Sequence, residues 1–245
     1  MQFYQSKLLK NHTNLIAAFT TKSSGNLAFH VDDNKPTVLN NHKNVAQALH
    51  YNQKTVVHMQ QIHSNIVKKV TDKDDFNHPP QCDALITDKK DIALMVMVAD
   101  CVPLLFFDPV KEVIAVAHAG RAGVFSNIVH NVIAAFSKEY GSCAAHIEVV
   151  IGPSIGRCCY EVGYEIYLEA QALQLDFAIE KRENKYFLDI QKALHFQLLQ
   201  EEVLETNIEN KHICNACNTQ DFYSYRVEKK TGRFAGVLML TNEPC

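Results

Sequence analysis

Short apolar segments recur through the middle of the chain, and they restrict the fold more than any other feature of the sequence. They are rich in β-branched or large apolar side chains, and several are apolar on both alternating faces. The longest uninterrupted apolar run, residues 92–99, is far shorter than the roughly 20 residues of a membrane-spanning helix. Such segments are typical of β-strands that are covered on both sides. We expect strands at residues 55–59, 66–70, 84–87, 92–98, 104–107, 113–117, 147–151 and 234–240.

Helical patterns lie between these strands. Apolar side chains recur at three- and four-residue steps in residues 126–140, and Ser126 precedes them as the predicted N-cap. Asp189 is the predicted cap of a second helix, and residues 36–51 and 160–175 are further helix candidates. The mixture of many short strands with helices predicts an α+β fold.

Composition and charge exclude several classes of function. With 47% hydrophobic residues and no repeat or linker, the chain has enough apolar material for a single domain over residues 1–245. The 24 basic and 27 acidic side chains give a net charge of −3, so we expect no nucleic-acid partner. No segment is long enough to span a membrane, and the first residues lack the basic start and apolar core of a secretory signal. We therefore expect a cytoplasmic protein without a membrane partner.

Eight cysteines occur in the chain, and in a reducing cytosol they favour metal ligation, nucleophilic chemistry or burial over disulfides. They are Cys82, Cys101, Cys143, Cys158, Cys159, Cys214, Cys217 and Cys245. Cys214 and Cys217 form a C-x-x-C pair, but no second such pair stands at zinc-ribbon spacing, so the pattern is a weak signal for a structural metal. For Cys158 and Cys159 we expect packing beside the turn at Gly156 rather than redox chemistry.

Three residues stand where a buried strand ends or turns. Cys101 and His118 each follow an apolar strand, and His63 lies in a predicted turn. Polar groups at such places are common functional positions, because the scaffold fixes them while a loop gives access. Taken singly, each has an ordinary alternative: a buried thiol, a hydrogen-bonded histidine at a sheet end and a solvated loop histidine.

Together, one cysteine and two histidines form a mixed nitrogen and sulfur donor set that suits zinc. Three protein ligands leave one tetrahedral position open, which is typical of catalytic rather than structural zinc sites. Water at that position would have its pKa lowered toward about 7 and would supply hydroxide at neutral pH. Because the three residues lie on separate segments, their spacing alone does not establish the site.

Eight short motifs occur in order between residues 56 and 240. They are Gln61-Ile-His-Ser64, Cys82-Asp-Ala-Leu-Ile-Thr-Asp88, Ala99-Asp-Cys-Val-Pro103, Ala117-His-Ala-Gly120, Ile151-Gly-Pro-Ser-Ile-Gly156, Tyr160-Glu-Val-Gly163, Phe222-Tyr-Ser-Tyr-Arg226 and Thr231-Gly-Arg233. This ordered set resembles the laccase-domain family of purine nucleoside phosphorylases, earlier described as multicopper polyphenol oxidases. The resemblance implies a mixed-sheet sandwich flanked by helices. It also assigns zinc to His63, Cys101 and His118, the same residues that the chemistry selects.

The resemblance implies an enzyme that uses phosphate to cleave adenosine, inosine, guanosine or methylthioadenosine, and family members are also described as deaminating adenosine. One well-described class of zinc deaminases places a His-x-Glu beside the metal. No such pattern includes His63 or His118, so deamination here needs another proton carrier. Asp100, next to Cys101, is our candidate for an acid/base or positioning role, and its ordinary alternative is a cap at the strand end.

Candidates for binding substrate and phosphate follow from charge and position. Arg226 carries a guanidinium suited to bidentate phosphate binding, and we assign it to catalysis as well. Lys22 stands where relatives have a basic residue near a glycine-rich loop, and Gln61 lies beside the first predicted ligand. The Gly-Trp-Arg-Gly segment of the family is Gly120-Arg121-Ala122-Gly123 here, in a chain without tryptophan. Arg121 therefore places a guanidinium one residue early.

Three alternatives use the same residues. Copper-dependent phenol oxidation is one, although copper centres with few thiolates normally have more histidine ligands. Covalent hydrolysis is another, with Cys101 as the nucleophile and His118 beside it. The third is a metal-stabilised binding module, in which the departures at Arg121 and Ala122 mark lost activity.

Overall fold

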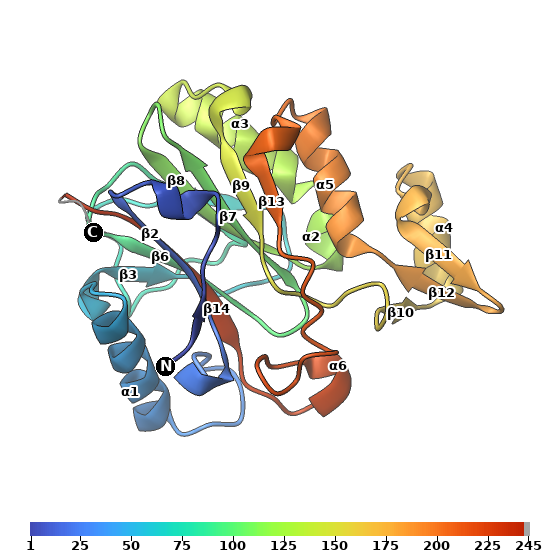
Figure 1. Ribbon diagram of the computed structural model, residues 1–245, viewed down its shortest axis with the longest axis horizontal. Coiled ribbons are helices and arrows are strands. Elements are labelled where there is room, and N and C mark those ends of the chain that lie inside the picture. The colour runs from blue at the N-terminus through green and yellow to red at the C-terminus, as the bar shows by residue number, and fades with distance from the viewer. Residues whose placement is uncertain (243–245) are drawn as a thin grey trace.

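Two mixed β-sheets pack face to face with helices on both outer sides in the computed structural model, which describes residues 1–242 (Figure 1). The five-stranded sheet consists, in spatial order, of β1 (Phe3–Tyr4), β2 (Leu15–Thr20), β14 (Phe234–Leu240), β6 (Ala93–Val98) and β3 (Val56–His58). The six-stranded sheet consists of β13 (Ile208–Asn210), β9 (Glu148–Ile151), β7 (Val102–Asp108), β8 (Val113–Ala119), β5 (Ala84–Thr87) and β4 (Val67–Lys69). A three-stranded sheet consists of β10 (Glu161–Val162), β12 (Lys185–Leu188) and β11 (Ile179–Arg182). Cys245 lies outside the described residues.

The helices cover the outer faces of the two large sheets. Helix α1 (Lys35–Ala48) packs on the five-stranded sheet, whereas α2 (Arg121–Phe125), α3 (Ile128–Tyr140) and α5 (Ile190–Gln200) pack on the six-stranded sheet (Figure 1). Helix α4 (Tyr164–Ala172) accompanies the three-stranded sheet, and α6 (Tyr225–Glu228) precedes β14. Short 3₁₀ helices occur at Leu9–Asn11, Lys22–Ser24, Gln53–Thr55, Ala144–His146, Asp176–Ala178 and Glu205–Asn207.

Side chains along the central strand β6 alternate between two apolar layers. Leu94, Val96 and Val98 join the layer between the two sheets, whereas Ala93 and Met95 pack in the layer beneath α1. Successive side chains of a strand point to opposite faces, and both faces of β6 are covered, one by a sheet and the other by a helix. The sequence therefore needs apolar residues at every position of β6. The predicted α+β fold of packed mixed sheets with flanking helices is confirmed.

The same alternation orients the end of β8. Ile114 and Val116 face the other sheet, whereas Ala115 and Ala117 face the helices on the outer side. By this period His118 lies on the inner face, at the point where β8 ends. Its imidazole is therefore directed toward the edge of the sandwich rather than toward the helices.

Two helix starts test the predicted caps. Helix α3 begins after Asn127, whose side chain accepts the backbone N–H of His130, so the prediction of Ser126 as the cap is wrong. The hydroxyl of Ser126 instead donates to the carbonyl of Ala122 within α2, at 2.9 Å. The prediction of Asp189 is confirmed, because its carboxylate accepts a backbone N–H within the first turn of α5 at 3.0 Å.

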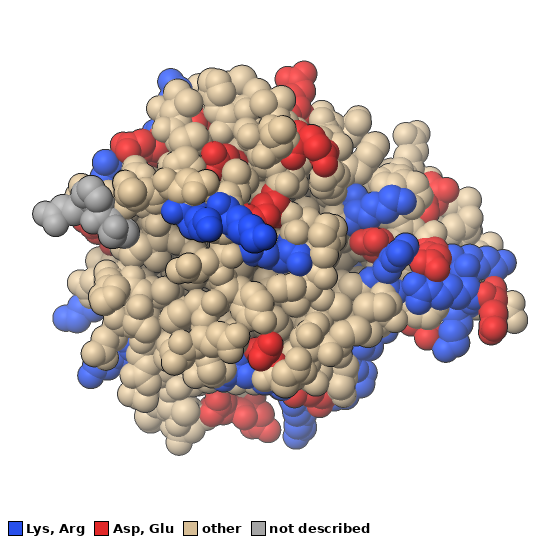
Figure 2. Space-filling model, viewed as in Figure 1, with Lys and Arg blue, Asp and Glu red and all other residues tan. Residues whose placement is uncertain are grey.

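The three-stranded sheet and α4 project from the sandwich as an arm (Figure 1). Basic and acidic side chains are interspersed on this arm (Figure 2). They include the pairs Arg182–Glu180 at 2.8 Å and Lys185–Glu161 at 2.9 Å. The charge of the arm is therefore mixed rather than of one sign.

Residues 99–101 carry the chain from one sheet of the sandwich to the other, since β6 and β7 belong to different sheets. Strands β7 and β8 are antiparallel neighbours in which Pro103 lies opposite His118. The start of β7 and the end of β8 therefore meet at the same edge of the sandwich. No helix within residues 1–242 is both long enough and apolar enough to cross a membrane.

Candidate metal centre

His63, Cys101 and His118 come together at this edge of the sandwich. Their candidate ligand atoms lie within 4.8 Å of one another. His63 Nε2 lies 4.0 Å from Cys101 Sγ, and the centroids of the two imidazole rings are 4.8 Å apart at an interplanar angle of 82°. Three residues selected from separate segments of the sequence therefore form one group.

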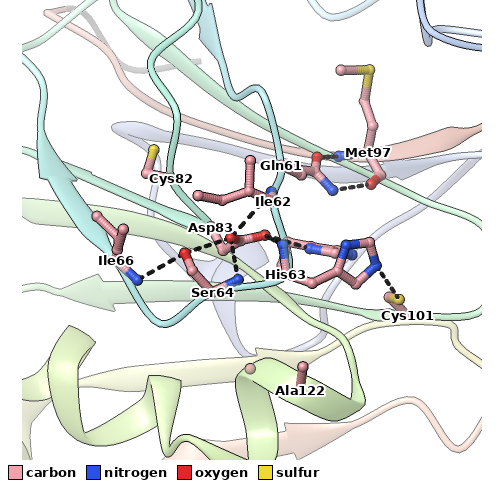
Figure 3. A network of polar contacts seen from close by, with 12 residues as sticks. Gln61, Ile62, His63, Ser64, Ile66, Cys82, Asp83, Met97, Cys101 and Ala122 are labelled. Carbon is pink, nitrogen blue, oxygen red and sulfur yellow. Dashed lines mark hydrogen bonds and ion pairs between the residues drawn. The ribbon is translucent and has the colours of Figure 1, made fainter.

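Asp83, which immediately precedes β5, holds both His118 and the turn that carries His63 in place, and Figure 3 shows its bonds to that turn. Its carboxylate accepts the backbone N–H groups of Ile62, His63 and Ser64 at 3.3, 3.0 and 2.6 Å. It also accepts the hydroxyl of Ser64 at 2.7 Å and bonds Nδ1 of His118 at 2.8 Å. The backbone of His63 has φ of 59°, which residues other than glycine seldom adopt. Asp83 thus stabilises an uncommon turn and orients an imidazole at the same time.

Opposite charges control protonation in this group. Burial alone lowers the pKa of His118, but the charge of Cys101 and the bond to Asp83 outweigh it and raise the pKa to about 9. Burial raises the pKa of Cys101, but the charge of His118 and hydrogen bonds from both histidines lower it to about 6. Burial also raises the pKa of Asp83, and hydrogen bonds from His118 and Ser64 bring it down to about 2. At neutral pH the metal-free group therefore holds a thiolate, which is the form of cysteine that ligates metals or attacks carbon.

The donor set fits an ion of the size of zinc. Zinc–nitrogen and zinc–sulfur bonds of ordinary length in a tetrahedral site place the two donor atoms about 3.6 Å apart. The observed separation of His63 Nε2 and Cys101 Sγ is 4.0 Å. A Cβ atom on Gly120 would lie 3.0 Å from both Cys101 Sγ and His63 Cδ2, so glycine keeps the space beside the donors free. His118 bonds Asp83 through Nδ1, which leaves Nε2 for a metal, as in the carboxylate–histidine pairs of many zinc sites.

Asp100 ties the segment before β7 to the first turn of α6, which carries Arg226. Its Oδ1 accepts the side-chain amide of Asn215 at 3.0 Å and the hydroxyl of Ser224 at 2.7 Å. Its Oδ2 accepts the backbone N–H of Arg226 at 2.6 Å. The backbone of Asp100 has φ of 98°, a strained conformation for a residue with a side chain. These bonds support that strain immediately before Cys101.

A pocket of about 640 Å³ opens beside the three candidate ligands. The cationic and aromatic side chains that line it are Arg121, Arg226, Lys229, Arg233, Tyr160 and Tyr225. The candidate metal group therefore shares one pocket with a concentration of positive charge and with aromatic rings.

Protein contacts orient the two predicted arginines of this pocket. Nη1 of Arg226 donates to the carbonyls of Cys159 and Glu161 at 3.3 and 2.9 Å, and its guanidinium lies 5.4 Å from the ring centroid of Tyr160. Nη1 of Arg121 pairs with Glu169 on α4 at 2.7 Å. Each guanidinium has five N–H donors, so these bonds leave others for an anion.

Gln61 and Lys22 have different surroundings. Gln61 lines the pocket, but its side-chain amide pairs with the backbone of Met97, donating to the carbonyl at 2.7 Å and accepting the N–H at 2.9 Å (Figure 3). Lys22 lies away from the pocket lining, where Nζ bonds the carbonyl of Thr219 and the carboxylate of Glu228, both at 2.6 Å. The fold thus brings together the predicted site residues except Lys22.

Several residues of the site were not assigned from the sequence. Asp83, Tyr160, Tyr225 and Arg233 each lie in one of the eight ordered motifs, whereas Lys229 lies in none of them. Membership in a motif was the available sequence signal for the first four residues. The directions of their side chains depend on how β5 and the loops after β9 and α6 pack, and the motifs do not describe this packing.

An α+β sandwich with a histidine–cysteine–histidine group at one edge defines a class of candidate metalloproteins. Within that class, the chain belongs to the multi-copper polyphenol oxidoreductase laccase family, whose model matches residues 17–241. The family resemblance expected from the ordered motifs is confirmed.

Relatives of the chain carry the name purine nucleoside phosphorylase. One is YlmD of Bacillus subtilis, 30% identical across 91% of this chain and 88% of its own length. Another is a purine nucleoside phosphorylase of Corynebacterium glutamicum, 34% identical across 92% of this chain and 94% of its own. Among solved structures, Bacillus licheniformis YfiH, titled a hypothetical protein, matches with a TM-score of 0.89 and 32% identity across 93% of both chains. YlmD of Geobacillus stearothermophilus matches with a TM-score of 0.86 and 28% identity across 94% of this chain and 93% of its own.

Proposed function

We propose that the protein is a zinc-dependent purine nucleoside phosphorylase that accepts adenosine, inosine, guanosine or methylthioadenosine. The observation that carries this proposal is the pocket shared by the histidine–cysteine–histidine group and four cationic side chains. An anion and a polar aromatic substrate are the two reactants that such a pocket suits. The names of the relatives support the same reaction.

In phosphorolysis an oxygen of inorganic phosphate forms a bond to C1′ of the ribose while the bond from C1′ to the purine nitrogen breaks. The purine leaves with the bonding electron pair and takes up a proton. We assign Arg226 and Arg121 to phosphate, since a guanidinium binds oxyanions through paired N–H groups. Lys229 and Arg233 add positive charge to the same pocket, and Tyr160 offers an aromatic face for the purine.

His63, Cys101 and His118 would hold the zinc ion, which supplies Lewis acidity to a polar group of the substrate or to water. We assign Asp100 a positioning role, because both of its oxygens already accept hydrogen bonds from the protein. Gln61 likewise acts by holding its turn against β6. Lys22 supports the pocket from outside by pairing with Glu228 of α6.

The most informative experiment incubates the protein with adenosine, with and without phosphate, and resolves adenine, inosine and hypoxanthine. Phosphorolysis predicts adenine and ribose 1-phosphate only when phosphate is present. Inosine formed without phosphate would add the deaminase activity that we also propose. Cys101→Ser should abolish both reactions, whereas Cys143→Ser, which changes an exposed cysteine elsewhere, should leave them intact. Equal release of adenine without phosphate would contradict a phosphorylase, and no product from zinc-loaded protein would favour a binding module.

Copper-dependent phenol oxidation is the second candidate, because the matched family is described as multi-copper. Within residues 1–242, however, groups of three or more metal-binding side chains occur at two places only, and the second is made of cysteines alone. Multi-copper chemistry would need further histidine-rich centres. Copper content and visible absorption in protein purified without added metal would favour oxidation, whereas zinc without colour would favour the phosphorylase.

The ionised Cys101 beside His118 and Asp83 also resembles a thiol nucleophile with its base, which is the geometry of covalent hydrolysis. Alkylation distinguishes a ligand from a nucleophile. A thiolate that ligates zinc should react with iodoacetamide slowly in zinc-loaded protein and rapidly after chelation. Equal reactivity in both forms would refute ligation by Cys101.

A further inference from the structure

Four cysteines gather at a second place, outside the histidine–cysteine–histidine group. Cys158 and Cys159 lie in the loop between β9 and β10, and Cys214 and Cys217 lie in the loop between β13 and α6. Their four sulfur atoms lie within 4.8 Å of one another. We call these residues the four-cysteine cluster. Cys158 is exposed and Cys159 partly exposed; both lie beside the Gly156 turn, as expected, and both also lie close to Cys217.

The distances in the four-cysteine cluster suit a single tetrahedral ion. Four zinc–sulfur bonds of about 2.3 Å place the sulfur atoms about 3.8 Å apart. Sγ of Cys217 lies 3.5 Å from that of Cys158 and 3.4 Å from that of Cys159. Because Cys217 is equally close to both, the arrangement suits a shared centre better than one pair of sulfur atoms.

Backbone groups complete the surroundings of the cluster. The N–H of Gly156 points to Sγ of Cys214, with 3.3 Å between nitrogen and sulfur, and the N–H of Cys217 also hydrogen-bonds this sulfur. Donors of this kind stabilise a metal-bound thiolate. A Cβ atom on Gly156 would lie 3.2 Å from Cβ of Cys214 and 3.4 Å from Sγ of Cys158, so this position leaves little room for a larger residue.

We propose that Cys158, Cys159, Cys214 and Cys217 bind one structural zinc ion, separate from the ion held by the histidine–cysteine–histidine group. Four thiolates fill a tetrahedral site and leave no open position, which is the mark of a structural rather than a catalytic site. Thiolate ligands select soft or borderline ions such as zinc over calcium or magnesium.

The ion would join the two loops that form one wall of the candidate catalytic pocket. The backbone N–H of Ile155 donates to the carbonyl of Asp100, and the side chain of Asn215 donates to its carboxylate. The carbonyl of Cys159 accepts Nη1 of Arg226. Cys159 itself contacts Arg226, and Asn215, which contacts Asp100, lies between Cys214 and Cys217. The cluster therefore acts as a positioning element for Arg226.

Zinc content and sulfur coordination test this proposal without reference to the nucleoside reaction. The Cys101→Ser protein, whose first site is impaired, should keep about one zinc per chain, and X-ray absorption should show four sulfur neighbours at about 2.3 Å. Wild-type protein should show about 2.5 sulfur neighbours per zinc, the mean of one and four. Cys217→Ser placed in the Cys101→Ser background should remove the remaining zinc, whereas Cys143→Ser in that background should not.

The measurement on wild-type protein needs no variant and so does not depend on whether Cys217→Ser folds. One zinc per wild-type chain with a single sulfur neighbour would overturn the proposal, as would disulfide bonds among the four cysteines of freshly purified protein. Failure of nucleoside cleavage would count against the proposed function but would leave the sulfur count unaffected. Cys217→Ser alone should retain the first zinc, melt at a lower temperature and raise KM for phosphate. Cys143→Ser, the control, should change neither the melting temperature nor KM.

Discussion

Two buried histidines in this protein are expected to differ in charge at slightly acidic pH: His118 is protonated and His42 is neutral. His118 and His42 expose only 3% and 1% of their surface, and each lies close to a second histidine ring. His118 faces the carboxylate of Asp83 and the thiolate of Cys101. His42 donates through Nε2 to the neutral carbonyl of Leu27 at 2.7 Å, and phenylalanine rings lie around it.

The consequence is a pKa difference between equally buried side chains. Burial, aided by the charge of neighbouring His58, lowers the pKa of His42 to about 4 despite the bond to Leu27. Anionic partners raise the pKa of His118 to about 9 although burial opposes them. Depth of burial therefore does not determine the role of a histidine here. The charge of its partners determines that role, and it distinguishes His42, a core residue, from His118, a candidate ligand.

The largest effect is expected from His118→Ala. Loss of the carboxylate partner of a metal-bound histidine typically costs 10- to 100-fold, so loss of the ligand itself should reduce kcat/KM for phosphorolysis more than about 100-fold. Protein carrying this variant should also bind one zinc ion fewer per chain. His42→Leu is the matched control and should retain both zinc and activity per folded molecule. Equal loss of zinc in the two variants would contradict the contrast between the two histidines.

Asp83→Asn keeps the shape of the side chain and removes its charge. We expect zinc affinity to fall by about 10- to 100-fold, because the amide holds the imidazole of His118 less firmly and makes it a weaker donor. In metal-free protein the pKa of His118 should fall toward its ordinary value. Competition with a chelator measures the first effect and NMR titration of the imidazole measures the second. Unchanged values in both would show that Asp83 only stabilises the turn at His63.

Acid should destabilise the protein through His42. Its pKa is about 4 in the folded chain and 6.5 in the unfolded chain, so between these values only the unfolded chain binds the proton. Stability from this group is present above pH 6.5 and is lost as the pH falls toward 4. Between pH 7 and pH 5 the loss is about 2 kcal/mol in the free energy of unfolding.

Urea denaturation of metal-free protein at the two pH values measures this loss. His42→Leu should reduce the difference between pH 7 and pH 5 by about that amount, whatever its effect on stability at pH 7. The contribution of His118 to stability depends on pH in the opposite direction. Its raised pKa stabilises the metal-free fold below pH 6.5, and this contribution is lost as the pH rises through 9. A pH dependence unaffected by His42→Leu would remove the basis of the comparison.

The smallest effect is expected at the surface. His130 also faces a carboxylate, with Nδ1 3.0 Å from Glu201, but 58% of its side chain is exposed. Water and salt screen such a pair, so His130→Ala should change the free energy of unfolding by less than about 1 kcal/mol and leave zinc content unchanged. A larger loss in urea denaturation would mean that an anionic partner alone, without burial, suffices to make a histidine structurally important.

Local patterns predicted much of the fold. Strands β5 and β14 have the predicted bounds, and β3, β4, β6, β8 and β9 lie within a residue or two of them. The hairpin of β11 and β12 was not anticipated, because its mixed polarity resembles that of a loop, and β2 was missed although five of its six residues are apolar. Ser126 was mistaken for a cap because Asn127, one residue on, offers the same kind of acceptor.

The sequence by itself determined which segments are apolar on both faces and which side chains of metal-binding type stand at their ends. It thereby determined the layered fold class and the three candidate ligands, since both follow from periods and residue types along the chain. Only the tertiary structure decided that Asp83 bonds His118 and raises its pKa, and that Asp100 accepts the backbone N–H of Arg226. Packing of the two sheets and register between β7 and β8 set these distances. Likewise, Cys158 and Cys159 meet Cys214 and Cys217 because two loops 55 or more residues apart end at one edge of the sandwich. No local pattern along a chain encodes the distance between loops that sheet packing brings together.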